Sequence, residues 1–292
     1  MSTIRLALLI CDDLIPPLKA IHGNYTPIYH HLLSSSLARI TSGGVLSAMQ
    51  CNCCDVTFTL DGYEVVKDMA YPPDSAHYDG LLISGSRASA YEDAEWINKL
   101  VAYVKRIITE KPSLKIFGIC FGHQIIARAL GESCVRNPSG WEVAVTTIQL
   151  TPLGKAIFGS DQLDIQQSHL DHVPTCSPNA HLLGLTDITP NHGMVIFDPA
   201  SVPILADLDS DAPSLNVPLT SIHVLTVQGH PEFTESIMTA LLDARAGILG
   251  EKLVKDARLR AGGIPGRSYP DGLACDGVGR VGKVIWGVLG VV

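Results

Sequence analysis

Lys115-Ile116-Phe117-Gly118-Ile119-Cys120-Phe121-Gly122-His123-Gln124 is the stretch that decides the fold. Its first half, Lys115–Ile119, is short and mostly apolar, which is typical of a covered strand in a parallel sheet. Apolar residues at helical spacing follow in Gly122–Leu130. Glycines two positions before and after Cys120 allow the strand and the helix to approach closely, and they leave the cysteine in a strained, exposed turn. The stretch therefore predicts a strand–turn–helix unit with a cysteine at its turn.

Strands and helices alternate in the chain before this unit. Apolar or alternating runs predict strands at Leu6–Cys11, Asp55–Leu60 and Gly80–Ile83. Helical spacing of apolar residues predicts helices at Tyr29–Ile40 and Ala94–Thr109. Strands and helices joined by short connections predict an α/β fold with a doubly wound, mostly parallel sheet flanked by helices.

The pattern changes after Gly140, where Pro and Asn separate shorter segments. We expect an additional antiparallel portion there, and residues 261–279 are Gly-rich and predict a loop before a short apolar helix or strand. The further expected elements are strands at Val143–Leu150, Ser201–Leu208 and Ile222–Gln228, and helices at Thr234–Ala246 and Glu251–Arg260. We predict one domain over residues 1–250, with residues 251–292 as an extension that packs on it or trails from it.

Composition excludes several classes of protein. The chain has 292 residues, of which 46% are hydrophobic, so it can bury a sizeable core and is not a disordered chain. Its net charge of −8 argues against nucleic acid or an anionic membrane as a partner. The apolar start leads directly into Asp12 and Asp13 without a signal-peptide cleavage site, and the apolar tail Val284–Val292 is too short to span a bilayer. Eight cysteines are too few for a disulfide scaffold, so we expect a cytoplasmic protein with reduced thiols.

A second cysteine-containing segment has no regular period. Residues 42–54 contain Cys51, Cys53 and Cys54. Their C-x-C-C spacing differs from that of a zinc knuckle, and no second cysteine pair follows. We therefore favour an irregular surface insertion over a metal site.

Cys120 is the candidate nucleophile. At a helix N-terminus the helix dipole favours a thiolate, and the N–H of Phe121 is placed to hold a developing oxyanion. The alternative is a small buried cysteine, which is common in proteins. The flanking glycines and the entering strand favour the nucleophile.

A base for this cysteine is found in Gln228-Gly229-His230-Pro231-Glu232, directly after a predicted strand. Side chains two residues apart on extended chain point to the same side, so Glu232 can orient the imidazole while His230 faces the thiol. A simple turn before the next helix is the alternative. The two motifs together predict a Cys-His-Glu triad.

These motifs resemble the class I glutamine amidotransferase family, and the likeness runs from about Leu6 to about Ala246. The resemblance implies a flavodoxin-like fold and cleavage of a γ-glutamyl amide through a thioester on Cys120. It also implies an oxyanion hole from the N–H groups of Ser86 and Phe121. The family usually has glycine at the position of Ser86.

The resemblance further implies residues that bind the substrate. They are Gly85, which precedes Ser86, Gln124 in the helix that follows Cys120, and Ser168 and His169 in a Ser-His-x-Asp loop. His169 and His172, three positions apart, also have the spacing of a metal pair, but no third ligand is evident nearby in the sequence. Residues 137–142 are expected either to face the pocket or to form a solvated turn. We expect no metal and no cofactor.

Three functions are compatible with these observations. The first is a glutaminase that supplies ammonia to a biosynthetic synthase partner, since no nucleotide-binding loop of the GxxxxGK[ST] type is present in this chain. The second is a free-standing γ-glutamyl peptidase acting on glutathione conjugates, like the stand-alone amidotransferase-like proteins of fungi and the γ-glutamyl peptidases of plants that this chain resembles. The third is a non-catalytic binding or chaperone-like protein on the same fold. The intact triad favours the first two.

Overall fold

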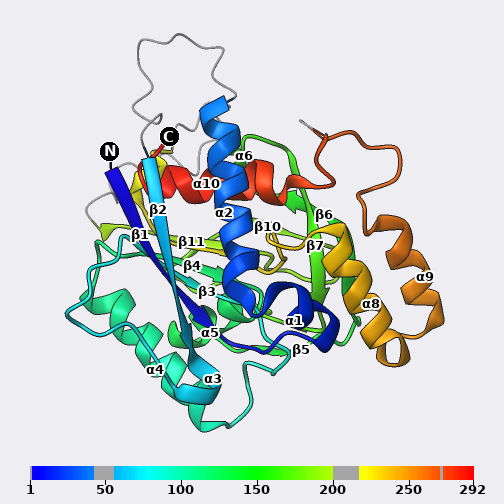
Figure 1. The fold of residues 1–292 in the computed structure, drawn as a ribbon, viewed down its shortest axis with the longest axis horizontal. Helices are drawn as coiled ribbons and strands as arrows, with labels where there is room; N and C mark the ends of the chain where they lie inside the picture. The colour runs from blue at the N-terminus through cyan, green and yellow to red at the C-terminus, as the bar shows by residue number, and fades with distance from the viewer. Residues whose placement is uncertain (1, 43–55, 200–216, 270–271) are drawn as a thin grey trace.

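A twisted seven-stranded sheet forms the centre of the computed structural model (Figure 1). The structure describes residues 2–42, 56–199, 217–269 and 272–292. The strand order is β2-β1-β3-β4-β12-β11-β9, in which the first five strands are parallel and the last two are antiparallel to their neighbours. The strands of this sheet are β1 (Ser2–Ile10), β2 (Val56–Glu64), β3 (Gly80–Ile83), β4 (Lys115–Ile119), β9 (His181–Leu182), β11 (Met194–Phe197) and β12 (Ile222–Val227).

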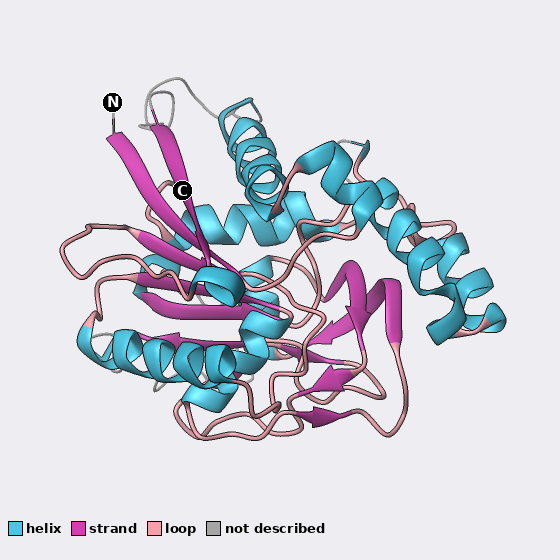
Figure 2. Ribbon diagram, turned by 60° about the horizontal axis from the view of Figure 1, so that its bottom comes forward, coloured by secondary structure: helices cyan, strands magenta, loops and turns pink. Residues whose placement is uncertain are grey.

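Helices cover both faces of this sheet (Figure 2). The alternation of side chains in β1 shows why both faces are apolar. Leu6 and Leu8 pack into a core shared with α2 (Tyr25–Ser42) and α10 (Gly282–Val288). Ala7 and Leu9 pack into a second core on the opposite face. That second core includes side chains of α3 (Val65–Asp68), α4 (Glu95–Glu110) and α5 (Phe121–Ala129).

A second, antiparallel sheet stands at one end of the molecule. Its order is β10-β6-β7, and a two-stranded β5-β8 pair lies beside the turn that joins β7 to β8. The remaining elements are β5 (Val135–Arg136), β6 (Glu142–Leu150), β7 (Gln162–His169), β8 (Asp171–His172), β10 (Gly184–Leu185), α1 (Pro16–His22), α6 (Pro152–Phe158), α8 (Glu235–Leu249), α9 (Glu251–Arg260), a 3-10 turn η3 (Leu219–Ser221) and a π-helical turn η5 (Gly277–Val281).

The predicted fold class, an α/β fold with a mostly parallel sheet and an antiparallel portion, is confirmed. One strand differs from the expectation. The sequence places the Ile222–Gln228 run in the antiparallel portion, and β12 does pair antiparallel with β11, but its other neighbour, β4, is parallel. All six residues of β12 are buried, a pattern that is typical of a strand in a parallel sheet and that favours the pairing with β4. The predicted strand Ser201–Leu208 and the cysteines at 51, 53 and 54 lie outside the described residues.

Several elements were not expected from the sequence, and β7, α1 and η5 are three of them. Six of the eight residues of strand β7 are buried, and Gln166 and Gln167 are among them. The polar side chains hide the apolar pattern by which a buried strand is recognised in a sequence. Helix α1 begins at Pro16, a position that suits proline because the N–H it lacks would have no helical partner. The π-helical turn η5 lies at the end of the expected loop, 261–279, and leads into α10.

Helices α9 and α10, from the C-terminal part of the chain, contact elements that precede them. Helix α9 contacts α8 and β6, and α10 contacts α2. Trp286 of α10 is fully buried, and its indole Nε1 donates to the Leu33 carbonyl at 3.1 Å and to Ser36 Oγ at 2.9 Å. Among the described helices, none has the length and apolar content needed to cross a bilayer.

Candidate active site

Cys120 occupies a strained turn at the carboxyl end of β4. Its backbone has φ 52° and ψ −104°, a conformation that non-glycine residues rarely adopt, and α5 begins at the next residue. A Cβ at Gly122 would lie 2.4 Å from the Ile83 carbonyl oxygen, and one at Gly118 would lie 2.8 Å from the Gly122 backbone. Both glycines are therefore required for this close approach of strand and helix.

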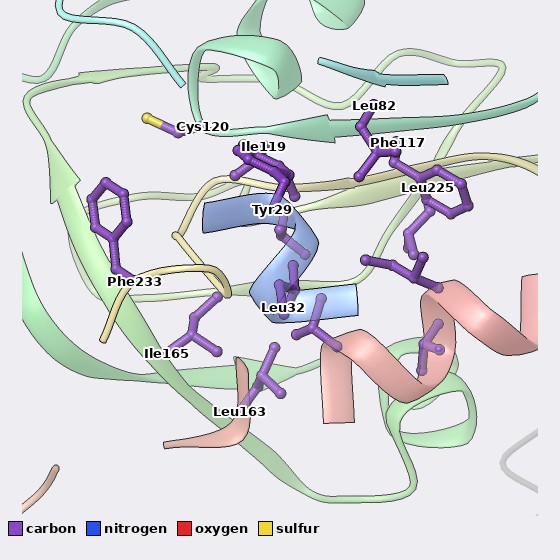
Figure 3. Close-up of a cluster of buried hydrophobic side chains, with 14 of the residues drawn as sticks. Tyr29, Leu32, Leu82, Phe117, Ile119, Cys120, Leu163, Ile165, Leu225 and Phe233 are labelled. Carbon is purple, nitrogen blue, oxygen red and sulfur yellow. The ribbon is translucent and has the colours of Figure 1, made fainter. Parts of the chain in front are cut away.

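The side chain of Cys120 is less exposed than expected. The residue is 3% exposed and borders the larger hydrophobic core, yet it also lines a surface pocket. Figure 3 shows its sulfur pointing away from the neighbouring hydrophobic side chains. The pocket thus gives a reactant access to the sulfur.

His230 and Glu232 follow β12, the strand beside β4. His230 Nδ1 lies 2.9 Å from Glu232 Oε1, and Tyr29 donates to the same oxygen at 3.4 Å. The backbone N–H of His230 donates to the Gln166 carbonyl at 2.7 Å, and its ring stacks on Phe233 with centroids 4.0 Å apart. These contacts occupy Nδ1 and one face of the ring, which leaves Nε2 for other partners, and Cys120 is among the groups that influence the imidazole.

The charges around His230 oppose the effect of its burial. Burial alone lowers the pKa of a histidine, but the nearby Cys120 thiolate and the Glu232 carboxylate raise the pKa of His230 to about 10. At neutral pH the imidazole therefore carries a proton beside the sulfur. A protonated imidazole next to a cysteine can act as a proton donor.

Gly85 leaves room for this imidazole. A Cβ at Gly85 would lie 2.7 Å from His230 Cε1 and 3.6 Å from Cys120 Cβ. Contacts under 3.0 Å require one group to move, and the ring is held on its other side by Phe233. The sequence predicted a substrate-binding role for Gly85, but Gly85 is not among the residues that line the pocket and lies against the imidazole of His230 instead.

We therefore expect Gly85→Ala to slow alkylation of Cys120 by iodoacetamide at pH 7 by about tenfold, because the displaced imidazolium no longer stabilises the thiolate. Mass spectrometry of the Cys120 peptide gives the rate. Gly247→Ala is the matched control, since a Cβ at that helical position meets nothing within 4 Å. Equal rates for the two variants would contradict the steric argument.

The pocket has a volume of about 270 Å³ and lies between the ends of β3 and β4, α8 and the second sheet. Four residues predicted for binding or for the oxyanion hole line it: Ser86, Gln124, Ser168 and His169. The side chain of Phe121 is buried against Trp96, so its predicted role would use the backbone N–H alone. Ser168 and His169 end β7 instead of lying in a loop. The remaining lining residues are Arg87, Ala88, Ser89, Tyr91, Cys120, Arg136, Trp141, Leu170, Asp171, Arg245 and Ile248.

Arg245 is a pocket residue that the sequence reasoning missed. Its Nη1 donates to Ser168 Oγ at 2.8 Å, and burial lowers the pKa of the guanidinium from its usual value. No described carboxylate forms an ion pair with it. Arg245 follows the buried Leu241 by four positions in α8, and a charge on the buried face of a helix is the signal that could have identified it.

A buried polar cluster supports one wall of the pocket. His192 Nε2 and His169 Nε2 lie 2.9 Å and 3.3 Å from Glu142 Oε2. The hydroxyls of Thr186 and Thr189 donate to the two carboxylate oxygens of Glu142 at 2.7 Å and 2.6 Å. The ligand atoms of the three titratable residues lie within 4.8 Å of one another, a spacing that could hold a metal ion. His172, which has the spacing of a metal pair with His169 in the sequence, is outside this group among the described residues. The threonine hydroxyls already donate to the carboxylate of Glu142.

The chain resembles known proteins over most of its length. The family model for glutamine amidotransferase class-I matches residues 46–245. A glutamine amidotransferase-like protein of Schizosaccharomyces pombe is 31% identical over 243 residues, which cover 83% of this chain and 85% of that protein. Gamma-glutamyl peptidase 4 of Arabidopsis thaliana is 29% identical over 217 residues, covering 72% and 76%.

The fold is also shared with a solved structure. A glutamine amidotransferase from Thermotoga maritima has a TM-score of 0.63 at 15% identity, with 99% of both chains covered. That likeness supports the fold alone, while the family model covers well over half of the chain. By its sequence, and with a fold that agrees, this chain belongs to the class I glutamine amidotransferase family.

Proposed function

We propose that this protein hydrolyses γ-glutamyl amide bonds through a thioester on Cys120. The observation that carries the proposal is the placement of Cys120, on a strained turn that opens into the pocket, beside an imidazole held by Glu232. The raised pKa of His230, to about 10, supports an ion pair at neutral pH. A binding protein without catalysis would not need this arrangement, since the strain of the turn has a cost in stability.

The residues of the site have distinct roles in the proposed reaction. The Cys120 thiolate attacks the amide carbon, and the N–H groups of Phe121 and Ser86 stabilise the oxyanion. His230 gives its proton to the leaving nitrogen as the C–N bond breaks, which leaves a γ-glutamyl thioester. Water then attacks the thioester while His230 accepts a proton, and glutamate and free Cys120 are released.

The charge of the pocket favours a γ-glutamyl peptide as substrate. Among its described lining residues three are arginines (Arg87, Arg136 and Arg245), and one, Asp171, is acidic. Arg87 is paired with Asp12, whereas Arg245 has no carboxylate partner among the described residues. A γ-glutamyl peptide has a second carboxylate on its leaving group, so it carries one more negative charge than glutamine and gains more from this field. The plant relatives named gamma-glutamyl peptidases agree with this choice.

Glutamine is the second candidate substrate, with its ammonia passed to a synthase partner. The family model and the amidotransferase-like relative of S. pombe support it. The two candidates differ in a simple assay. Turnover of glutathione and a glutathione conjugate by the isolated protein supports the peptidase, and turnover of glutamine that appears when a partner protein is added supports ammonia supply.

A glutamine-like electrophile tests the shared chemistry directly. We expect 6-diazo-5-oxonorleucine to label the protein once, at Cys120, because this thiolate lines the pocket while the other described cysteines have their thiols neutralised by burial. Mass spectrometry of the peptides locates the label, and excess γ-glutamyl substrate should protect against it. Labelling elsewhere, or none, would favour a non-catalytic role for this fold.

A further inference from the structure

Gln228 lies beside the sulfur of Cys120 without belonging to the predicted triad. It follows β12 directly, is fully buried, and its Nε2 lies 3.6 Å from Cys120 Sγ. Its backbone N–H donates to the His192 carbonyl at 2.9 Å, which fixes the residue at the end of the strand. A buried amide in this position can present either its oxygen or its NH₂ group to the sulfur, and the two have opposite effects on a thiolate.

Neighbouring groups decide which end of the amide faces the sulfur. The Asp171 backbone carbonyl can only accept hydrogen bonds, and it lies 3.0 Å from Gln124 Nε2, so the NH₂ end of Gln124 must be there. The same NH₂ group lies 3.2 Å from Gln228 Oε1. With its oxygen occupied by Gln124, Gln228 turns its NH₂ group to Cys120. The orientation of the Gln228 amide thus follows from the Asp171 backbone carbonyl, which can only accept hydrogen bonds.

The position of that backbone acceptor is itself held from the other side. His169 Nδ1 lies 3.1 Å from the same Asp171 carbonyl, and the ring of His169 approaches Glu142 with its other nitrogen. A continuous series of polar contacts therefore runs from the buried Glu142 through His169, Asp171 and the two glutamines to the nucleophile. A network of this kind keeps the NH₂ group of Gln228 pointing toward Cys120.

We propose that Gln228 is a further catalytic residue, whose amide N–H donates to the Cys120 thiolate and stabilises its charged form. Hydrogen bonds to an ionised acceptor are about twice as strong as neutral ones, so the thiolate gains more than the thiol. His230 and Gln228 then approach the sulfur from different positions, and the imidazolium is free to give up its proton while the amide stays in place. The proposal deepens the proposed function because it concerns the same nucleophile.

Titratable groups on other elements lie close enough to Cys120 to interact with it electrostatically, and the variants below retain them. They are His230 after β12, Tyr29 on α2, Arg245 on α8 and Cys134 after α5. A change in the pH dependence of Cys120 in a Gln228 variant therefore reports the amide and not a lost charge.

Gln228→Met keeps the length of the side chain and removes its N–H. We expect the midpoint of the rate of Cys120 alkylation by iodoacetamide against pH to rise by about one unit, and the rate at neutral pH to fall by up to tenfold, since a hydrogen bond to a charged group is lost. Peptide mass spectrometry separates Cys120 from the other thiols. Gln167→Met is the matched control because Gln167 is another fully buried glutamine, whose amide has no partner among the described residues, and its midpoint should equal that of the wild type.

A second variant keeps the test decisive if the first one fails to fold. Gln228→Glu preserves the shape, brings a carboxylate beside the sulfur and should raise the midpoint further than Gln228→Met. A folded Gln228→Met or Gln228→Glu protein with the wild-type midpoint would overturn the proposal. The alkylation measurement needs no substrate, so the two proposals can be tested separately. An unchanged midpoint together with labelling of Cys120 by 6-diazo-5-oxonorleucine would overturn the role of Gln228 alone. A raised midpoint without that labelling would overturn the proposed function alone.

Discussion

Replacing Cys120 by alanine should abolish the release of glutamate from γ-glutamyl substrates, with a loss of about 10⁴-fold or more in kcat. Removal of a nucleophile in a triad costs about this much because the remaining groups can no longer form the covalent intermediate. The alanine variant should stay folded, because Cys120 lies at the border of the core and its side chain is small. Glutamate release measured enzymatically gives the rate, and the thermal unfolding curve shows that the variant is folded.

Cys120→Ser is the control that separates chemistry from electrostatics. A hydroxyl stays neutral at this pH range, so the largest effect that raises the pKa of His230 is lost and that pKa should fall from about 10 towards its usual value. An NMR titration of the imidazole measures it. The raised pKa stabilises the folded state fully below the unfolded value of about 6.5, and this stabilisation is lost as the pH rises towards 10. An unchanged rate in the alanine variant, or an unchanged His230 titration in the serine variant, would exclude the proposed ion pair.

Replacing Trp286 by alanine should lower the free energy of unfolding by about 3–5 kcal/mol, the range measured for large aromatic side chains in protein cores. The indole is fully buried between α2 and the sheet, packs edge to face on Phe58 at 5.4 Å, and donates to Leu33 and Ser36. Its loss leaves a cavity and two acceptors without their donor. Urea unfolding monitored by circular dichroism measures the change.

Leu259→Ala is the control for this prediction, because Leu259 lies in the same C-terminal segment but is 68% exposed. It should change stability by no more than about 0.5 kcal/mol. The pair of variants tests our proposal that residues 251–292 are part of the folded unit. Equal effects would show that α10 is dispensable for the domain.

The fold class could be predicted because the deciding patterns are local. Strand β4 has the predicted bounds, Lys115–Ile119, and α9 has the predicted bounds, Glu251–Arg260. The glycines around Cys120 predicted the strained turn that its φ of 52° shows. The two neighbours of β12 could not both be predicted, because a run that is buried throughout favours parallel pairing but does not indicate the antiparallel neighbour, β11, that β12 also has.

The sequence by itself determined the chemistry of the candidate site: a cysteine between two glycines, and a histidine two residues before a glutamate, are short-range patterns whose geometry follows from the backbone. Only the tertiary structure decided the surroundings of that chemistry. Arg245, Gln228 and Glu142 reach the site from α8, from the end of β12 and from β6, and no local spacing relates them to Cys120. The physical reason is that hydrogen bonds and charges act over a few ångströms in space, whatever the separation along the chain.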